Sequence, residues 1–349
     1  MREFYWDWTK KDGYPNPSNL TAFGTFVCGG GSTMGYKLAG YKHLGGVEID
    51  PRMAQIYRTN HNPKHFYLED IRLFNKRTDL PEELYNLDLL DGSPPCTTFS
   101  LCGKREAGWG VKKRFAEGQT EQVLDDLVFV YCDTVRKLQP KVAILENVPG
   151  LVAGKAKYYA IRIVEMLNDA GYNVQIFLLN SATMGVPQAR ERVFFVARRE
   201  NLNFPPLSLE FNKPPIRFGE IADKGCLTGQ PKPLWPSVAA RWPYVGPNDQ
   251  NLKFADAKYR GLKTYNAFFS TVILHDNDVA GALTSSGTSL YYNEVRNLND
   301  TEYIRMSSFP RDFDFCGFDV RYVCGMSVPP LMTASIASEI RKQYFEKGG

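Results

Sequence analysis

The sequence contains few of the residues that bind metal ions. Only four histidines and seven cysteines occur in 349 residues. Neither a C-x-x-C pair nor an H-E-x-x-H segment is present, and these are the spacings that zinc sites usually need. We therefore expect no metal site. Because the cysteines are scattered and odd in number, we expect free thiols in a reducing cytoplasm.

Long apolar runs and a secretory leader are also missing. No run approaches the roughly 18 residues that a membrane-spanning helix needs. The N-terminal stretch MREFYWDWTKKDGYPNPSN is polar and rich in turn-forming residues. These absences predict a cytoplasmic protein that does not enter a membrane. No long Lys/Arg block occurs and the net charge is only +4, so contact with a polyanion would need a folded groove.

From about residue 25 to residue 199, short apolar runs alternate with helical segments. Pro140 ends one of these helical segments, and Gly171 follows another. This alternation predicts an α/β, Rossmann-like fold with a mostly parallel sheet and helices on both faces. Ligands of such sheets bind outside the carboxyl ends of the strands. The expected strands are GTFVCGGG, HLGGVEID, HFYLEDI, LYNLDLLDGSPPC, KVAILENV, NVQIFLLN and RVFFVARR.

The texture of the sequence changes after Arg199. Nine prolines between residues 205 and 247 interrupt the chain, and helical periodicity is lost. We predict a first domain at 1–199, a smaller loop-rich module at 200–280, and a segment at 281–349 that returns to the first domain. The chain ends in a helical pattern, SVPPLMTASIASEIRKQYF, for which Ser327 is the expected N-cap.

A glycine-rich turn, FVCGGGSTMG, follows the first expected strand. Such a turn lets the backbone approach a ligand closely, and an acidic residue at the end of the next strand can hold both hydroxyls of a ribose. Glu48 is that residue. Asp70, at the end of the third strand, could accept a hydrogen bond from an adenine amino group. A structural tight turn and a helix N-cap remain the plain alternatives for these two features.

Cys96 follows two prolines in the segment DGSPPCTTFS, just past a strand end. A thiolate is the best side-chain nucleophile near neutral pH. The next stretch, LCGKREAGWGVKKRFAEGQ, combines four glycines with five basic residues, and a loop of this kind suits closure over a phosphate backbone. An inert core cysteine beside an ordinary solvated loop is the alternative.

Two further segments bring charged residues to the same sheet edge. KVAILENVPGL delivers Glu146 and Asn147, and a carboxyl there could protonate or hydrogen-bond a base ring. In GVPQARERVFF, Gln188, Arg190 and Arg192 precede a strand. Arg192 could hold the carbonyl oxygen of a base, and Arg190 could orient a carboxylate. Turn, cap and strand-start roles are the structural alternatives.

In this order and combination, the segments resemble the DNA cytosine-5 methyltransferase family along nearly the whole chain. The Gly-rich cofactor turn, the Pro-Cys motif, the Glu-Asn-Val motif and the Gln-x-Arg-x-Arg motif all have counterparts in the residues quoted above. Late in the chain, RNLNDTEYIRMSSFP and GMSVPP are similar to the family's last two motifs. The resemblance implies double-stranded DNA as partner and S-adenosylmethionine as cofactor.

The family resemblance also implies a role for each matching residue. Cys96 would attack carbon 6 of a flipped cytosine, Glu146 would bind ring nitrogen 3 and the amino group, and Arg192 would hold the carbonyl. Asn147, Gln188 and Arg190 complete the catalytic set, and the module at 200–280 would recognise the target sequence. Residues matching the family's cofactor pocket are Phe26, Gly30, Gly31, Glu48, Ile49, Asp70, Ile71, Pro95, Leu127, Ser327 and Val328.

Three positions depart from the family pattern. Cys28 stands where the first glycine of the cofactor turn is usual, Thr97 replaces a common Gln, and Met326 replaces an Asn. We keep open that Cys28 and Met326 change the preference among sulfonium cofactors. Cytosine methylation of RNA and a silent DNA-binding relative are the competing functions. A monomer is expected, and a separate companion restriction nuclease remains open.

Overall fold

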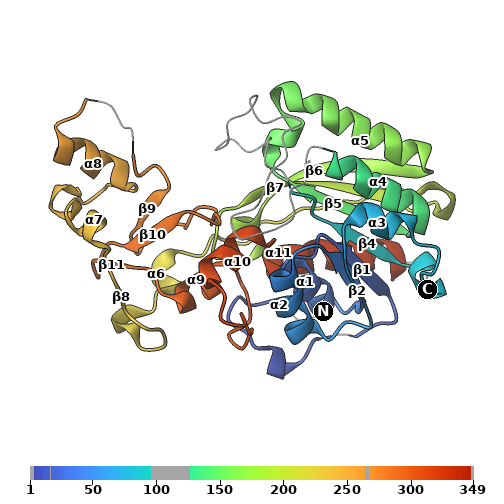
Figure 1. Cartoon of the computed structure of the whole chain (residues 1–349), viewed down its shortest axis with the longest axis horizontal. Coiled ribbons are helices and arrows are strands. Elements are labelled where there is room, and N and C mark those ends of the chain that lie inside the picture. The colour runs from blue at the N-terminus through green and yellow to red at the C-terminus, as the bar shows by residue number, and fades with distance from the viewer. Residues whose placement is uncertain (1–3, 16, 96–125, 264–266, 347–349) are drawn as a thin grey trace.

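The computed structural model describes residues 4–15, 17–95, 126–263 and 267–346 (Figure 1). Cys96, Thr97 and the basic loop that follows them lie outside the described residues. The chain forms a large lobe around a seven-stranded sheet and a smaller lobe beside it. Within the described ranges, no helix combines the length and the apolar character needed to cross a membrane.

The large sheet confirms the predicted α/β fold. Its strand order is β3-β2-β1-β4-β5-β7-β6, and every neighbouring pair from β3 to β5 is parallel. Only β7 runs against its neighbours, β5 and β6. The strands are β1 (Thr21–Thr25), β2 (Lys42–Glu48), β3 (His65–Leu68), β4 (Leu89–Gly92), β5 (Val142–Asn147), β6 (Tyr172–Asn180) and β7 (Glu191–Arg199).

Helices cover both faces of this sheet, as the alternation of the sequence predicts (Figure 1). Side chains alternate along each strand: Ala22 and Leu89 belong to one apolar cluster, while their neighbours Phe23 and Leu90 belong to the other. The first cluster lies under α1 (Gly31–Leu38), α2 (Pro51–His61) and α11 (Pro330–Ile340), and the second under α3 (Ile71–Lys76), α4 (Leu127–Leu138) and α5 (Lys157–Asp169).

The end of the chain differs in one detail from the prediction. Helix α11 begins at Pro330 with Pro329 as its N-cap, so the expected N-cap role of Ser327 is wrong. Ser327 instead ends the preceding helix, α10 (Val320–Met326), and its hydroxyl donates to the Val323 carbonyl at 2.8 Å. A serine hydroxyl can satisfy either a helix start or a carbonyl four residues earlier, and here the second use prevails.

The smaller lobe contains a four-stranded sheet of order β8-β11-β10-β9. Its core consists of Val238, Leu252, Ala255, Ile273 and Leu290. The domain boundaries at 199/200 and 280/281 stay predictions. The strands and helices of this region are β8 (Lys232–Pro233), β9 (Thr271–Leu274), β10 (Thr288–Tyr291), β11 (Arg296–Asn297), α6 (Phe218–Ile221), α7 (Pro236–Ala239) and α8 (Leu252–Arg260).

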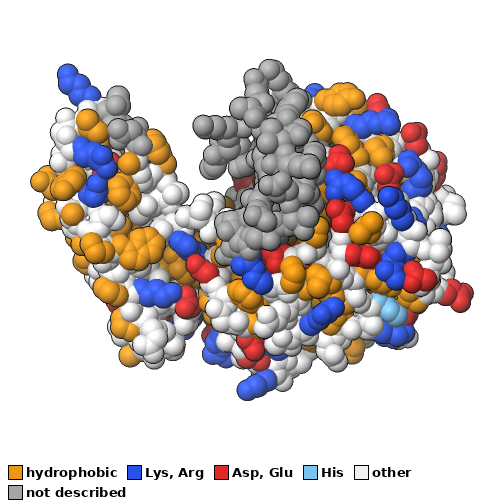
Figure 2. Space-filling view, in the orientation of Figure 1, with side chains coloured by type: hydrophobic (Ala, Val, Ile, Leu, Met, Phe, Trp, Pro, Cys, Tyr) orange, Lys and Arg blue, Asp and Glu red, His pale blue; other side chains and the backbone are white. Residues whose placement is uncertain are grey.

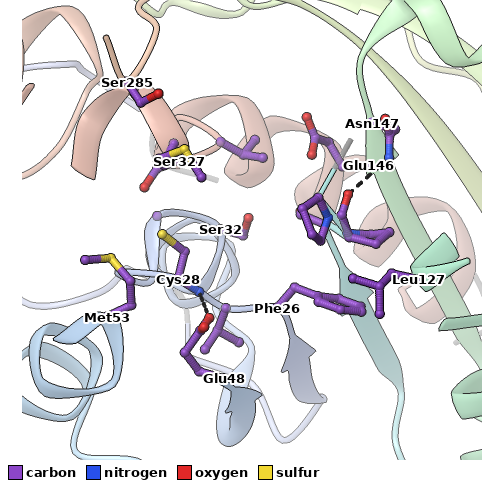
Figure 3. A pocket seen from close by; sticks show the side chains of 18 of the residues that line it. Phe26, Cys28, Ser32, Glu48, Met53, Leu127, Glu146, Asn147, Ser285 and Ser327 are labelled. Carbon is purple, nitrogen blue, oxygen red and sulfur yellow. Dashed lines mark hydrogen bonds between the residues drawn. The ribbon is translucent and has the colours of Figure 1, made fainter. Parts of the chain in front are cut away.

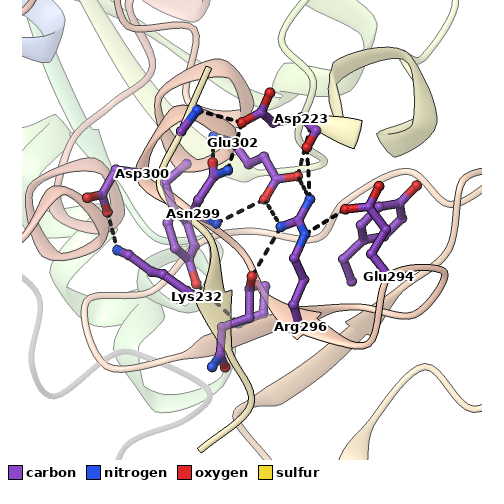
Figure 4. A network of polar contacts seen from close by, with 12 residues as sticks. Asp223, Lys232, Glu294, Arg296, Asn299, Asp300 and Glu302 are labelled. Carbon is purple, nitrogen blue, oxygen red and sulfur yellow. Dashed lines mark hydrogen bonds and ion pairs between the residues drawn. The ribbon is translucent and has the colours of Figure 1, made fainter. Parts of the chain in front are cut away.

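A buried ion pair connects the small sheet to helix α9 (Asp300–Met306) (Figure 4). Two guanidinium nitrogens of Arg296 bond both carboxylate oxygens of Glu302, at 2.8 and 2.9 Å. Glu302 also accepts the backbone N–H groups of Asp223 and Asn299, each at 2.9 Å. Asn299 in turn donates to the Asp223 carboxylate. A buried ion pair is stable only when hydrogen bonds to its donors and acceptors offset the cost of desolvating the two charges.

Replacing one carboxylate of this network should destabilise the protein. In Glu302→Gln the amide nitrogen faces donors from Arg296 and the backbone, so the buried guanidinium loses its main partner. We expect the free energy of unfolding to fall by about 3 kcal/mol. Urea denaturation followed by circular dichroism measures it, with the exposed Glu82→Gln as the matched control. Equal stabilities of the two variants would contradict the assigned importance of the network.

Candidate active site

A cavity of about 370 Å³ opens at the carboxyl ends of the parallel strands (Figure 3). Its walls come from the segments that follow β1, β2, β3, β4 and β5, from the start of β7, and from α10. The volume lies in the range of small-molecule sites. The position agrees with the expectation that a parallel sheet binds its ligand beyond the strand ends.

Most of the residues that we predict for the cofactor pocket lie on this cavity wall. The exception is Gly30, the N-cap of α1, which does not line the cavity. The lining includes Phe26, Gly31, Glu48, Ile49, Asp70, Ile71, Pro95, Leu127, Ser327 and Val328. The cavity therefore brings together residues that are 300 positions apart in the sequence.

Glu48 is a buried carboxylate that anchors the Gly-rich turn. Its Oε2 accepts the Cys28 N–H at 2.7 Å, and its Oε1 accepts the Ile49 and Asp50 N–H groups, each at 2.9 Å. Burial raises the pKa of Glu48, and these three donors act in the opposite direction. A carboxylate offers about four acceptor sites, so one remains for a ligand hydroxyl.

Asp70 follows strand β3 and precedes helix α3. It is the N-cap of α3 and accepts the Arg72 N–H at 2.8 Å. Its side chain also lies on the cavity wall. Its Oδ2 pairs with the Arg72 guanidinium at 3.3 Å, and a bond to an adenine amino group stays a prediction.

Two of the positions that depart from the family pattern lie on the same wall. Cys28 adopts a left-handed backbone conformation with φ of 48°, and its side chain lines the cavity (Figure 3). Burial raises the pKa of the Cys28 thiol to about 12, so the thiol is neutral near pH 7. Met326 lines the cavity as well. The cavity wall therefore has a thiol where the family usually has a glycine, and a thioether where it usually has an asparagine amide.

Glu146 and Arg192 form an ion pair at the far side of the cavity. The Arg192 Nε and the Glu146 Oε1 lie 2.8 Å apart, and both side chains are largely buried. The antiparallel pairing of β5 with β7 produces this contact, because Glu146 is in register with Phe194, two residues beyond Arg192. The pair places one carboxylate and one cation at the edge where a flat, polar ring could bind.

Arg190 also lies on the cavity wall, and its role toward a carboxylate stays a prediction. Its guanidinium donates to the carbonyls of Leu283 and Gly325, at 2.8 and 3.1 Å. Burial lowers the pKa of Arg190, and the nearby Arg192 does so too. Gln188 is buried beside it, accepts the Leu283 N–H at 3.0 Å and does not line the cavity. Gln188 and Arg190 thus connect separate segments of the chain.

Asn147 holds the backbone that leads to Cys96. Its Nδ2 donates to the Pro94 carbonyl at 3.2 Å, and its Oδ1 accepts the Val148 N–H at 2.9 Å (Figure 3). Ser93 and Pro95 lie on the cavity wall immediately before Cys96. Pro95, the residue before Cys96, therefore lies at the edge of the cavity.

The sequence analysis missed several residues of the wall. Met53 comes from α2 and Ser285 from the connection between β9 and β10 (Figure 3). Tyr322 comes from α10. None of them belongs to a motif, and only the chain path brings them here. Among the described residues, no group of three or more His, Cys, Asp or Glu side chains could hold a metal ion.

Known proteins resemble this chain in both sequence and structure. A family model, C-5 cytosine-specific DNA methylase, matches residues 22–230. The Type II methyltransferase M1.HphI of Haemophilus parahaemolyticus is 26% identical over 93% of this chain and 87% of its own length. M.AplI of Arthrospira platensis is 26% identical over 97% of this chain and 91% of its own. A DNMT2 variant of Spodoptera frugiperda has a similar fold, with a TM-score of 0.63 and 17% identity over 94% of this chain and all of that one.

The Gly-rich turn should not tolerate a methyl group at Gly30. This residue has φ of 92°, and an added Cβ would lie 2.1 Å from the His61 Nε2. Gly171 has nearly the same φ, 91°, but open space around the added atom. Gly171→Ala should cost about 1 kcal/mol of backbone strain, and Gly30→Ala about 2 kcal/mol more for the collision. Thermal denaturation measures both, and equal losses would contradict the tight packing of the turn.

Proposed function

Because the chain belongs to the C-5 cytosine-specific DNA methylase family, we propose that it transfers a methyl group from S-adenosylmethionine to carbon 5 of a cytosine flipped out of double-stranded DNA. The observation that carries this proposal is one cavity with two different ends. One end is built around Glu48 and the Gly-rich turn, and the other around the Glu146–Arg192 pair. A methyl donor and an acceptor ring can therefore meet in a single site.

The end around Glu48 suits S-adenosylmethionine. The remaining acceptor site of Glu48 would take one ribose hydroxyl, and Asp70 would accept a hydrogen bond from the adenine amino group. Phe26, Ile71 and Leu127 offer apolar surface for the adenine ring. When bound, the cofactor supplies an electrophilic methyl group. Cys28 and Met326 on the wall are the positions at which the preference among sulfonium analogues would be set.

The end around Glu146 suits a cytosine ring. Its carboxyl would hold ring nitrogen 3 and the amino group, and Arg192 would hold both that carboxyl and the ring carbonyl. Cys96 would attack carbon 6 as a thiolate, which makes carbon 5 nucleophilic toward the methyl group. After transfer a base removes the carbon-5 proton and the thiolate leaves. The target carbon is inaccessible in stacked DNA, so the base must leave the duplex.

The hollow between the two lobes suits the DNA (Figure 2). Trp235 and Tyr244 of the small lobe are 50% and 44% exposed, so they can contact or stack on bases. Arg241 cannot, because it is buried and its Nε lies 2.5 Å from the Asp256 carboxylate. Trp242 packs against the apolar core of the small lobe. Sequence-specific recognition by this lobe is part of the proposal, as are a cytoplasmic monomer and a separately acting restriction nuclease.

Cys96→Ser should abolish methyl transfer and leave DNA binding largely intact, because the hydroxyl is a far poorer nucleophile than the thiolate. Purified protein is incubated with mixed-sequence duplex DNA and labelled S-adenosylmethionine, followed by nucleoside mass spectrometry. Wild type should produce 5-methylcytosine and the variant none. Product on RNA alone would favour the competing RNA function, and no product on either would favour a silent DNA-binding protein.

Glu146→Gln should slow methyl transfer by a factor of about 100 or more, which is the scale of a lost general acid. The amide keeps the shape of the side chain and cannot give up a proton to the ring. Single-turnover kinetics with saturating DNA isolate this step. Glu191→Gln, an exposed change on the same strand as Arg192, is the control and should keep the wild-type rate. A wild-type rate in Glu146→Gln would overturn the assigned role.

A further inference from the structure

Strand β4 carries a buried carboxyl that the proposed chemistry does not use. Asp91 is 6% exposed and lies on the strand that leads to Cys96. The Tyr36 hydroxyl donates to its Oδ1 at 2.7 Å. A buried carboxyl with so few partners is costly to a fold, and such groups tend to occur where a protein uses a proton.

The register of the sheet places Asp91 on the same face as Glu146. Asp91 is paired with Ile144 across the parallel β4–β5 ladder, and Glu146 is two residues further along β5. Since side chains two residues apart point to the same face, both carboxyls lie on the face that α1 and α11 cover. Phe194, in register with Glu146, closes this face on the β7 side.

A small cavity joins the two carboxyls. It is lined by Asp91, Glu146, Tyr36, Ser32 and Thr333 together with apolar side chains, and its volume is about 10 Å³. That is room for about one water molecule, and a buried water needs two to four polar partners. The five polar side chains supply them. Glu146 also lines the large cavity, so its carboxyl lies between the proposed cytosine site and Asp91.

We propose that Asp91 is a positioning residue that exchanges a proton with Glu146 through a water molecule in this small cavity. The proposal rests on the proposed function. As ring nitrogen 3 of cytosine takes up a proton, the Asp91 carboxyl gives its proton to the water, the water passes one to the Glu146 carboxylate, and Glu146 passes it on to the ring. When the ring gives its proton back, the same path returns it to Asp91, so no charge leaves the site.

The charges around Asp91 support this exchange near neutral pH. Burial raises the pKa of Asp91 to about 7, and the negative charge of Glu146 raises it too, whereas the Tyr36 hydroxyl and the Gly92 N–H lower it. Ser32 from α1, Thr333 from α11, Arg192 from β7 and Arg190 just before β7 also lie near the two carboxyls. Tyr57 from α2 and Tyr131 from α4 interact electrostatically with Asp91. Asp91 therefore holds a proton below about pH 7 and releases it above.

The decisive experiment compares the pH dependence of single-turnover methyl transfer in wild type and Asp91→Asn. Asparagine keeps the hydrogen bond from Tyr36 but cannot release a proton. The wild-type rate should fall as the pH rises through about 7. At pH 6 the variant should be about tenfold slower than wild type, a smaller loss than removal of a directly acting acid causes. Its pH–rate profile should also lack the falling limb above about pH 7. Asp88→Asn, on the amino side of the same strand, is the control and should keep the limb.

Tyr36→Phe keeps the titrating Asp91 carboxyl and changes its pKa. Without the hydroxyl, the Asp91 carboxylate loses a donor, so its pKa rises and the limb should move to higher pH. A variant with an unmoved limb, or an Asp91→Asn protein with the wild-type rate and limb, would overturn the exchange while leaving the proposed function intact. A wild-type protein that does not methylate DNA would overturn the proposed function and the exchange together.

Stability provides a readout of the Asp91 proton that does not depend on activity. Folding raises the pKa of Asp91, so between about pH 4 and 7 the folded protein binds more protons than the unfolded chain. The contribution of the Asp91 proton to the free energy of unfolding is therefore lost as the pH rises through about 7. The melting temperature of Asp91→Asn relative to wild type should therefore increase from pH 5 to pH 8. A constant difference would show that Asp91 holds no proton near neutral pH and would overturn the proposal.

Discussion

The ion pair between Glu146 and Arg192 is the contact on which the geometry of the site depends. Desolvating two charges is costly, and only a close, well-supported pair offsets that cost. The support is the antiparallel pairing of β7 with β5, which brings Arg192 alongside the last residues of β5. Strand β7, which runs antiparallel to its neighbours, therefore brings the Arg192 cation to the sheet edge where the parallel strand β5 places the Glu146 carboxylate.

The same segment connects the two lobes. Just before β7, Gln188 bonds the Leu283 backbone, and Arg190 bonds the carbonyls of Leu283 and Gly325. Leu283 lies between β9 and β10 of the small sheet, and Gly325 lies in α10. These bonds fix the connection between β9 and β10, and helix α10, to the segment that leads into β7.

Two buried carboxyls at this edge show how the surroundings of a group decide its chemistry. Glu48 accepts three backbone N–H groups, which oppose the effect of burial and suit a fixed acceptor. Asp91 has the Tyr36 hydroxyl and one backbone N–H against burial and the charge of Glu146. The first arrangement suits holding a ligand, and the second suits exchanging a proton.

The sequence by itself determined the α/β class and the residues that reach the strand ends, because apolar periodicity and Gly-rich turns are local signals. It did not reveal that Ser327 ends a helix, that Arg192 pairs with Glu146, or that Asp91 shares a cavity with Glu146. The last two depend on the register between strands that are far apart in the chain. A shift of one residue turns a side chain to the opposite face of a sheet, and only the packed tertiary structure decides that register.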